Sequence, residues 1–102
     1  MKGKDLQKSV IDLAHLYHWS VVHNPAVETK HRGWTTALAA DAKGFVDLLL
    51  FRERCVAIEI KGDGDTLRPH QLEWRDRIQR ANVEWYAIRP ADWPDKVKEI
   101  LA

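Results

Sequence analysis

The sequence predicts a single α/β domain over residues 1–102, in which a mixed four-stranded sheet is flanked by helices. Three observations lead to this fold class. Apolar residues recur at helical spacing over 4–17. Two apolar, strand-like runs at 47–51 and 55–61 flank a three-residue connection that favours an antiparallel hairpin. The strand 55–61 is followed by a helix and another strand, which implies a parallel pair and the order α, β, β, β, α, β, α.

The first helix is predicted over 4–17 because its apolar residues share one face: Leu6, Val10, Leu13, Ala14 and Tyr17. The run His18–His23 is typical of a short strand, and Asn24-Pro25 ends it. Thr35–Lys43 can form two helical turns ahead of a Gly44 cap. The connection from the first to the second strand is long for so small a domain, and such connections are often functional.

The second half of the chain predicts a helix, a strand and a final helix. Pro69 suits the first turn of a helix that runs to about Ala81. Asn82 is a plausible left-handed cap before a β-branched and aromatic strand over 83–88. Asp92 is expected to cap the final helix, whose apolar residues recur on one side: Trp93, Val97, Ile100 and Leu101. Trp19, Trp85 and Trp93 are expected in the core.

Composition limits the partners. The formal net charge is only +1, so any nucleic-acid surface must be local. Five tryptophans are many for a small domain, and a partner subunit that covers part of them makes a homodimer reasonable. The single cysteine, Cys55, excludes an intrachain disulfide and fits a reducing compartment. No apolar stretch approaches the roughly 20 residues that span a bilayer, so we expect a cytoplasmic protein without membrane contact.

Two carboxylates and one lysine stand out from the apolar strands. Alternation puts Glu59 and Lys61 on the same face, and the hairpin brings Asp47 beside Glu59 at one end. Mg²⁺ favours carboxylate oxygens, and Mn²⁺ is the alternative; the backbone carbonyl of Ile60 can complete the ligand set. Lys61 can then orient water and stabilise charge that develops on a phosphoryl group, which predicts phosphodiester hydrolysis. The competing interpretation is a structural salt bridge at the strand ends.

These residues carry a resemblance to a known family. Gly44-Phe45-Val46-Asp47, Glu59-Ile60-Lys61, the Gln-x-x-Trp of Gln71 and Trp74, and Arg89-Pro90 resemble the PD-(D/E)xK nuclease superfamily. Within it the chain is most similar to the VRR-NUC family in its short, stand-alone phage and bacterial form.

The resemblance implies a restriction-endonuclease-like αβββαβ core and a metal-dependent DNA endonuclease. It implies that Asp47 and Glu59 bind the metal, that Lys61 is catalytic, and that Gln71 supports the site or contacts substrate. Small members resemble Holliday junction resolvases, which act as dimers on branched DNA, so branched or junction DNA and a homodimer are expected here.

Two positions depart from the family pattern. Val46 stands where proline is usual, and it should be tolerated because this proline shapes a turn without touching metal. The family often supplies an acidic residue near the position of Gly3 or Lys4, and neither can ligate a metal; Asp5 serves only if the helix is shifted. A non-catalytic nucleic-acid-binding or interaction module that retained the nuclease fold is therefore the alternative, and an RNA- or metabolite-directed hydrolase is a third.

The remaining candidates lie in the long connection and at the second helix. Lys30, His31 and Arg32 either contact substrate phosphate beside the active site or form a solvated loop. Trp34 can stack on a base, although a structural role is at least as good an interpretation. His70 and Gln71 begin a helix whose N-terminus favours phosphate.

Overall fold

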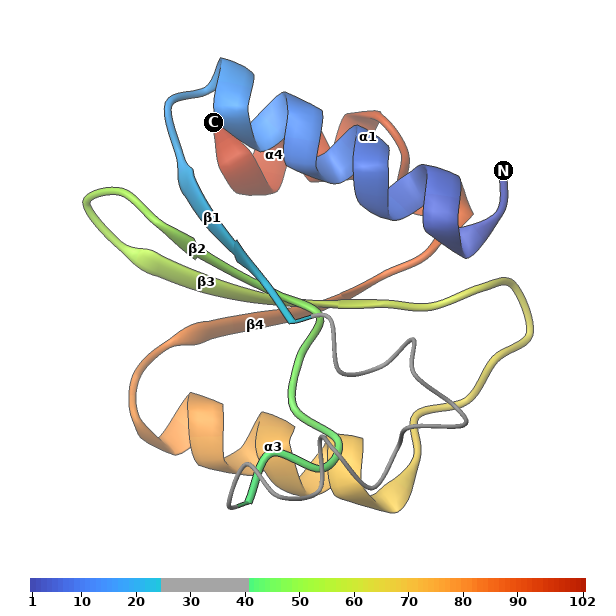
Figure 1. Cartoon of the computed structure of the whole chain (residues 1–102), viewed down its shortest axis with the longest axis vertical. Coiled ribbons are helices and arrows are strands. Elements are labelled where there is room, and N and C mark those ends of the chain that lie inside the picture. The colour runs from blue at the N-terminus through green and yellow to red at the C-terminus, as the bar shows by residue number, and fades with distance from the viewer. Residues whose placement is uncertain (25–40) are drawn as a thin grey trace.

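The computed structural model describes residues 1–24 and 41–102, which form a four-stranded sheet with helices on both faces (Figure 1). In chain order the elements are α1 (Gly3–Leu16), β1 (Ser20–His23), β2 (Leu48–Phe51), β3 (Cys55–Ile60), α3 (Pro69–Arg80), β4 (Glu84–Ile88), the 3-10 turn η3 (Pro90–Asp92) and α4 (Asp95–Leu101). The predicted α/β class and order of elements are confirmed. No helix of the described ranges is long and apolar enough to cross a membrane.

The sheet has the order β1-β2-β3-β4, with the first two pairs antiparallel and the last pair parallel. The predicted hairpin is confirmed, since Leu48 lies opposite Ile58 and Phe51 opposite Cys55. This register brings the residue before β2, Asp47, next to Glu59. The parallel partner of β3 is also as predicted, and its pairing runs to the end of both strands, where Ile60 lies opposite Ile88.

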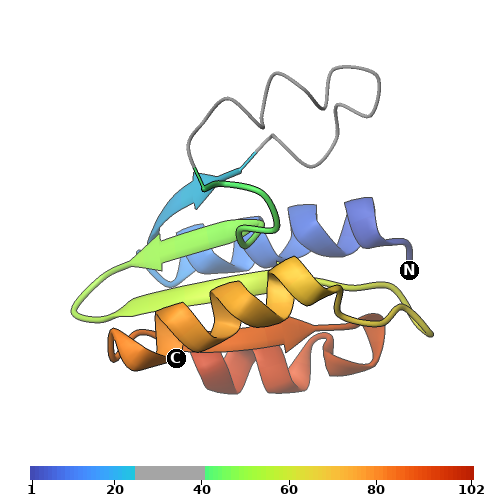
Figure 2. The ribbon, with the colours of Figure 1, turned by 90° about the horizontal axis from the view of Figure 1, so that it is seen from below.

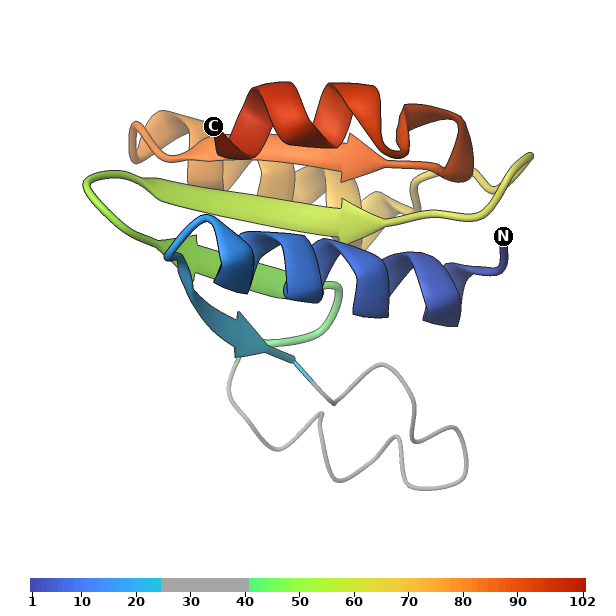
Figure 3. The same ribbon diagram turned by 90° about the horizontal axis from the view of Figure 1, so that it is seen from above.

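Side-chain alternation divides the strands between two cores. The larger core packs α1 and α4 against one face of the sheet, seen from above in Figure 3; its fully buried members include Leu6, Val10, Leu48, Leu50, Val56, Ile58, Val97 and Leu101. The smaller core, under α3, holds Val46, Ala57 and Ile78 (Figure 2). Because Ala57 faces α3, so do the next alternate positions of this strand, Glu59 and Lys61. The α3 face therefore carries the charged strand end.

Three local predictions need correction. The strand predicted from His18 starts at Ser20, because His18 has φ 70° and closes the turn after α1. Asp92 does not cap the final helix. It lies in η3, where its Oδ2 accepts the Arg89 N–H at 2.8 Å, and α4 begins at Asp95. Asn82, by contrast, has φ 62°, as a left-handed cap requires. Of the three tryptophans expected in the core, Trp19 is buried, while Trp85 and Trp93 are half-buried against the two cores.

The long connection is described only from residue 41 onward. The helical turns predicted over 35–43 therefore lie mostly outside the described residues, as do Lys30, His31, Arg32 and Trp34. Gly44 has φ +80°, a left-handed conformation that glycine adopts without steric cost. Its position is discussed with the site below.

Candidate active site

Asp47 and Glu59 form a buried carboxylate pair at the open end of the β2–β3 hairpin. Their exposed fractions are 7% and 2%. The Ile60 N–H donates to Asp47 Oδ2 at 2.7 Å. Asn24, at the end of β1, donates its N–H to the Asp47 carbonyl at 2.8 Å and its side-chain amide to the Val46 carbonyl at 3.3 Å. Both neighbouring strands thus fix the position of Asp47.

The environment of Glu59 favours its protonated form. Burial raises the pKa of Glu59 to about 9, and the negative charge of Asp47 and a hydrogen bond between the two carboxyl groups act in the same direction. The charge of Lys61 opposes this rise in the pKa. At neutral pH the metal-free pair therefore holds one proton, which a metal ion that binds both carboxylates has to displace.

Lys61 directly follows β3, and its exposed fraction is 8%. The backbone at Lys61 and Gly62 is held by β4 and the residue after it: the Lys61 N–H donates to the Ile88 carbonyl at 2.9 Å, and Arg89 Nη1 donates to the Gly62 carbonyl at 2.7 Å. Within the described part of the chain, no hydrogen bond or ion pair engages the Lys61 ammonium. The residue is buried as a whole, but among the described side chains only Trp85 Nε1 is a buried polar atom without a hydrogen-bond partner, so the Lys61 Nζ reaches the solvent of the cavity it lines, where a ligand can supply a counter-charge.

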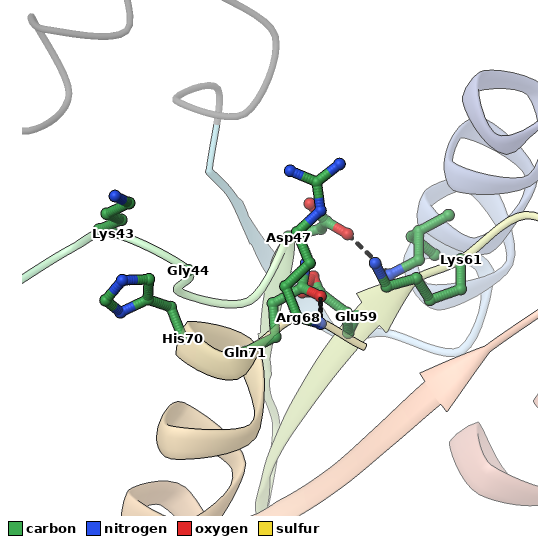
Figure 4. A pocket seen from close by; sticks show the side chains of 9 residues that line it. Lys43, Gly44, Asp47, Glu59, Lys61, Arg68, His70 and Gln71 are labelled. Atoms are coloured by element: carbon green, nitrogen blue, oxygen red, sulfur yellow. Dashed lines mark hydrogen bonds between the residues drawn. The ribbon is translucent and has the colours of Figure 1, made fainter. Parts of the chain in front are cut away.

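A cavity of about 400 Å³ opens over the carboxylate pair. Figure 4 shows the two carboxylates side by side, with Lys61 on one side and Lys43 and His70 on the other. The cavity is lined by Lys43, Gly44, Asp47, Glu59, Ile60, Lys61, Arg68, His70 and Gln71. The structure thus brings together every predicted site residue that lies in the described ranges.

Gln71 reaches this cavity from the first turn of α3. Its Oε1 accepts the Arg68 N–H at 2.8 Å, which closes the start of the helix and fixes the orientation of the amide. The Nε2 hydrogens remain to donate to a ligand. That Gln71 supports the site or contacts substrate stays a prediction, and this geometry allows either role. The neighbouring His70 has its Nδ1 3.1 Å from Glu73 Oε1.

Gly44 allows the segment before β2 to pack directly on α3. A Cβ at Gly44 would lie 2.4 Å from the Cβ of His70 and 2.8 Å from its backbone carbonyl carbon, so no larger residue fits without displacement. This close approach brings Lys43 to the cavity. Sequence reasoning missed Lys43 and Arg68 as cavity residues; the only signals were their positions directly before Gly44 and Pro69.

The donor set suits a hard divalent cation. Two buried carboxylates face one cavity, burial and the charge of Asp47 raise the pKa of Glu59, and the Ile60 backbone is at the same place. Among residues 1–24 and 41–102, no group of three His, Cys, Asp or Glu residues is positioned for a metal. The α1 helix begins at the end of the sheet where β3 ends (Figures 1 and 3), yet Gly3 and Lys4 supply no ligand there and Asp5 is exposed. Within the described residues, the site therefore holds two carboxylates.

Comparison with known proteins agrees with this geometry. The VRR-NUC domain matches residues 5–92, nearly the whole chain, including Asp47, Glu59, Lys61 and Gln71. No curated protein and no solved structure matches the chain. VRR-NUC domains belong to the PD-(D/E)xK nuclease superfamily, whose members generally use divalent metals, and the domain implies nuclease activity with DNA as a substrate. The chain belongs to the VRR-NUC family.

Proposed function

We propose that this protein is a divalent-metal-dependent DNA endonuclease that hydrolyses phosphodiester bonds at Asp47, Glu59 and Lys61. The observation that supports this most strongly is one cavity lined by a buried carboxylate pair and by Lys61, whose ammonium has no partner among the described residues. A purely structural salt bridge does not explain it, because no ion pair joins Lys61 to either carboxylate within 4.0 Å. A metal and a phosphate together supply the missing charges.

Asp47, Glu59 and the Ile60 carbonyl hold the metal in this proposal, with Mg²⁺ as the first candidate and Mn²⁺ as the alternative. A bound divalent ion supplies Lewis acidity and an activated water. Lys61 donates to a phosphoryl oxygen or to the attacking water and stabilises the negative charge that develops. Its low exposure strengthens this interaction, because little water screens it. Gln71 Nε2 donates to a substrate oxygen while Oε1 stays on the Arg68 N–H.

The finer features of the substrate are also proposals. We assign branched DNA, including four-way junctions, as the preferred substrate, and a homodimer in the cytoplasm as the acting form. Lys30, His31 and Arg32 are proposed as contacts to substrate phosphates. They lie outside the described residues, and the support for them is their place in the chain before the Gly44–Asp47 motif.

A non-catalytic nucleic-acid-binding module is the second candidate, and the observation that favours it is that neither Gly3 nor Lys4 carries a carboxylate and that Asp5, in the first turn of α1, is exposed. A Cβ at Gly3 meets no atom within 4 Å, so Gly3→Glu can be accommodated. If the missing ligand limits catalysis, Gly3→Glu raises the cleavage rate. If the protein is a binding module only, this variant stays inactive.

The test is incubation with supercoiled, linear and four-way-junction DNA in Mg²⁺ and in Mn²⁺. Asp47→Asn is the informative variant, because asparagine retains an oxygen for the Ile60 N–H but removes the charge. Asp95→Asn, an exposed carboxylate on α4, is the matched control. We expect cleavage by the wild type and the control and none by Asp47→Asn. Binding without cleavage in either metal would favour the binding module, and cleavage of RNA but not junction DNA would reassign the substrate.

A further inference from the structure

Two cations in the cavity have no role in the proposed chemistry. Lys43 and Arg68 line it together with Lys61. In Figure 4, Lys43 lies on the far side of the carboxylate pair from Lys61, and the guanidinium of Arg68 points away from α3. No hydrogen bond or ion pair of either side chain is found within residues 1–24 and 41–102. Both residues are exposed, so water can solvate their charges, and their place at the wall of the cavity makes them available to an anionic ligand that enters it.

The backbone of both residues is firmly placed. Trp74 Nε1 donates to the carbonyls of Asp41 and Lys43, at 3.1 Å each, so the turn that carries Lys43 is tied to α3. The contact of Gly44 with His70 holds the same turn from the other side. Arg68 is fixed by the bond from its N–H to Gln71. The backbone that carries the two cations is therefore fixed at the N-terminal end of the 12-residue helix α3.

The charges of the cavity indicate what this arrangement binds. One phosphate beside the carboxylate pair is matched by Lys61, whose ammonium lines the cavity and has no partner among the described residues. Lys43 and Arg68 remain, and the positive end of the α3 dipole adds to them. His70 is not counted, because Glu73 lies 3.1 Å from its Nδ1 and offsets its charge. A second anionic group, adjacent to the first, is the ligand that balances them.

We propose that Lys43 and Arg68 bind the phosphodiester next to the scissile one on the same DNA strand. The contact is to the backbone and does not depend on base sequence. This inference rests on the proposed function, since it takes the phosphate beside Asp47 and Glu59 as the scissile one. It also predicts how the cut DNA strand lies in the cavity: the strand runs from Lys61 over the two carboxylates toward Gly44 and α3.

The first test is the salt dependence of DNA binding, measured by fluorescence anisotropy with a short labelled duplex in Ca²⁺. A residue that neutralises one phosphate lowers the slope of log K against log salt by about one when it is removed. Lys43→Ala and Arg68→Ala should each do so, and Arg68→Lys should restore the slope. Arg80→Ala is the matched control, since Arg80 is an exposed residue on the same helix outside the cavity. Unchanged slopes in both alanine variants would overturn the proposal.

The second test locates the phosphate. Duplexes carry a single neutral methylphosphonate, placed one position to either side of the cut that the wild type makes. We expect one of the two modified duplexes to bind the wild type about tenfold more weakly than the unmodified duplex does. The Lys43→Ala/Arg68→Ala double variant should bind that modified duplex and the unmodified duplex with equal affinity. Equal losses for both proteins at both positions would contradict the assignment. Unfolding curves of every variant show that the fold is retained.

The outcomes separate this inference from the proposed function. If DNA is cleaved but Lys43→Ala and Arg68→Ala keep the wild-type slope, the endonuclease stands and the second phosphate site does not. If no metal supports cleavage but both variants lose slope, the phosphate site stands on a binding module. For that second case, the methylphosphonates are scanned along the duplex instead of being placed around a cut.

Discussion

The two ends of the β2–β3 hairpin each carry three charged residues, and their charges are satisfied in different ways. At the turn end, Arg52 Nε lies 2.5 Å from Glu53 Oε2, and Arg54 Nη1 lies 2.6 Å from Glu84 Oε1. Both guanidinium groups also lie over the Trp19 ring, with their Cζ atoms 4.5 and 5.1 Å from its centroid. The turn end is electrostatically complete within the chain.

At the open end the charged residues are buried, and no ion pair joins them within the described part of the chain. Two carboxyl groups share one face with like charge, and the Lys61 ammonium has no partner within the described residues. The pKa of Glu59 is raised to about 9 there, chiefly by burial. Burial without pairing costs free energy, so this end is stabilised by what it binds. The ion pairs that stabilise the hairpin thus lie at its turn end, whereas the charges at its open end are available to bind a ligand.

This contrast predicts the largest effect at Lys61. Lys61→Ala should lower the single-turnover cleavage rate by about a thousandfold, because it removes a preorganised positive charge from beside the reacting phosphate. Arg52→Ala, at the turn end, should leave the rate unchanged. Quench-flow measurements at saturating protein separate the chemical step from DNA binding. A cleavage rate for Lys61→Ala within tenfold of the wild type would contradict its catalytic role.

The next largest effect concerns the packing that forms the cavity. Gly44→Ala should lower the free energy of unfolding by about 3 kcal/mol, because the new Cβ meets backbone and side-chain atoms of His70. Gly64→Ala is the control: Gly64 also has φ +80°, but a Cβ there meets nothing within 4 Å, so strain alone costs about 1 kcal/mol. Urea denaturation measures both. Equal losses would show that the contact with His70 adds nothing.

The raised pKa of Glu59 predicts how stability depends on pH. Between the ordinary value of 4.5 and about 9, folded Glu59 holds a proton that the unfolded chain has released, so the folded state binds more protons. The free energy of unfolding of the metal-free protein should therefore fall as pH rises through this window, by about 2 kcal/mol from pH 6 to pH 8. Glu59→Gln should remove most of this slope. Denaturation in EDTA at several pH values tests it, and a wild-type slope that survives in Glu59→Gln would contradict the assignment.

The smallest effect is expected at the turn end. Arg54→Ala should lower the free energy of unfolding by about 1 kcal/mol, since the lost ion pair with Glu84 is partly exposed and salt-screened. The cleavage rate should not change. Lys8→Ala, which breaks the more exposed pair with Asp12, is the control and should have no measurable effect. A slower cleavage step in Arg54→Ala would mean that the two ends of the hairpin are coupled.

The open end was predictable from sequence because its geometry is local. A three-residue connection and side-chain alternation suffice to set Asp47 opposite Glu59 and Lys61 on the same face. Lys43 and Arg68 were not predictable, because their place at the cavity depends on contacts between distant segments, namely Gly44 with His70 and Trp74 with the turn before it. The prediction that Asp92 caps the final helix was wrong for a related reason. An aspartate side chain can accept a backbone N–H in a 3-10 turn as well as at a helix start, and only the course of the chain after Arg89 shows that Asp92 does the former.

The metal site at Asp47 and Glu59 can be tested by a calorimetric titration of Mn²⁺ into the wild type and Glu59→Gln at pH 7, in buffers of different ionisation enthalpy. We predict that the wild type binds Mn²⁺ with release of close to one proton, the one shared by Asp47 and Glu59. Glu59→Gln should bind at least tenfold more weakly, without proton release. Equal affinity in the two proteins, or no binding by the wild type, would contradict a two-carboxylate metal site.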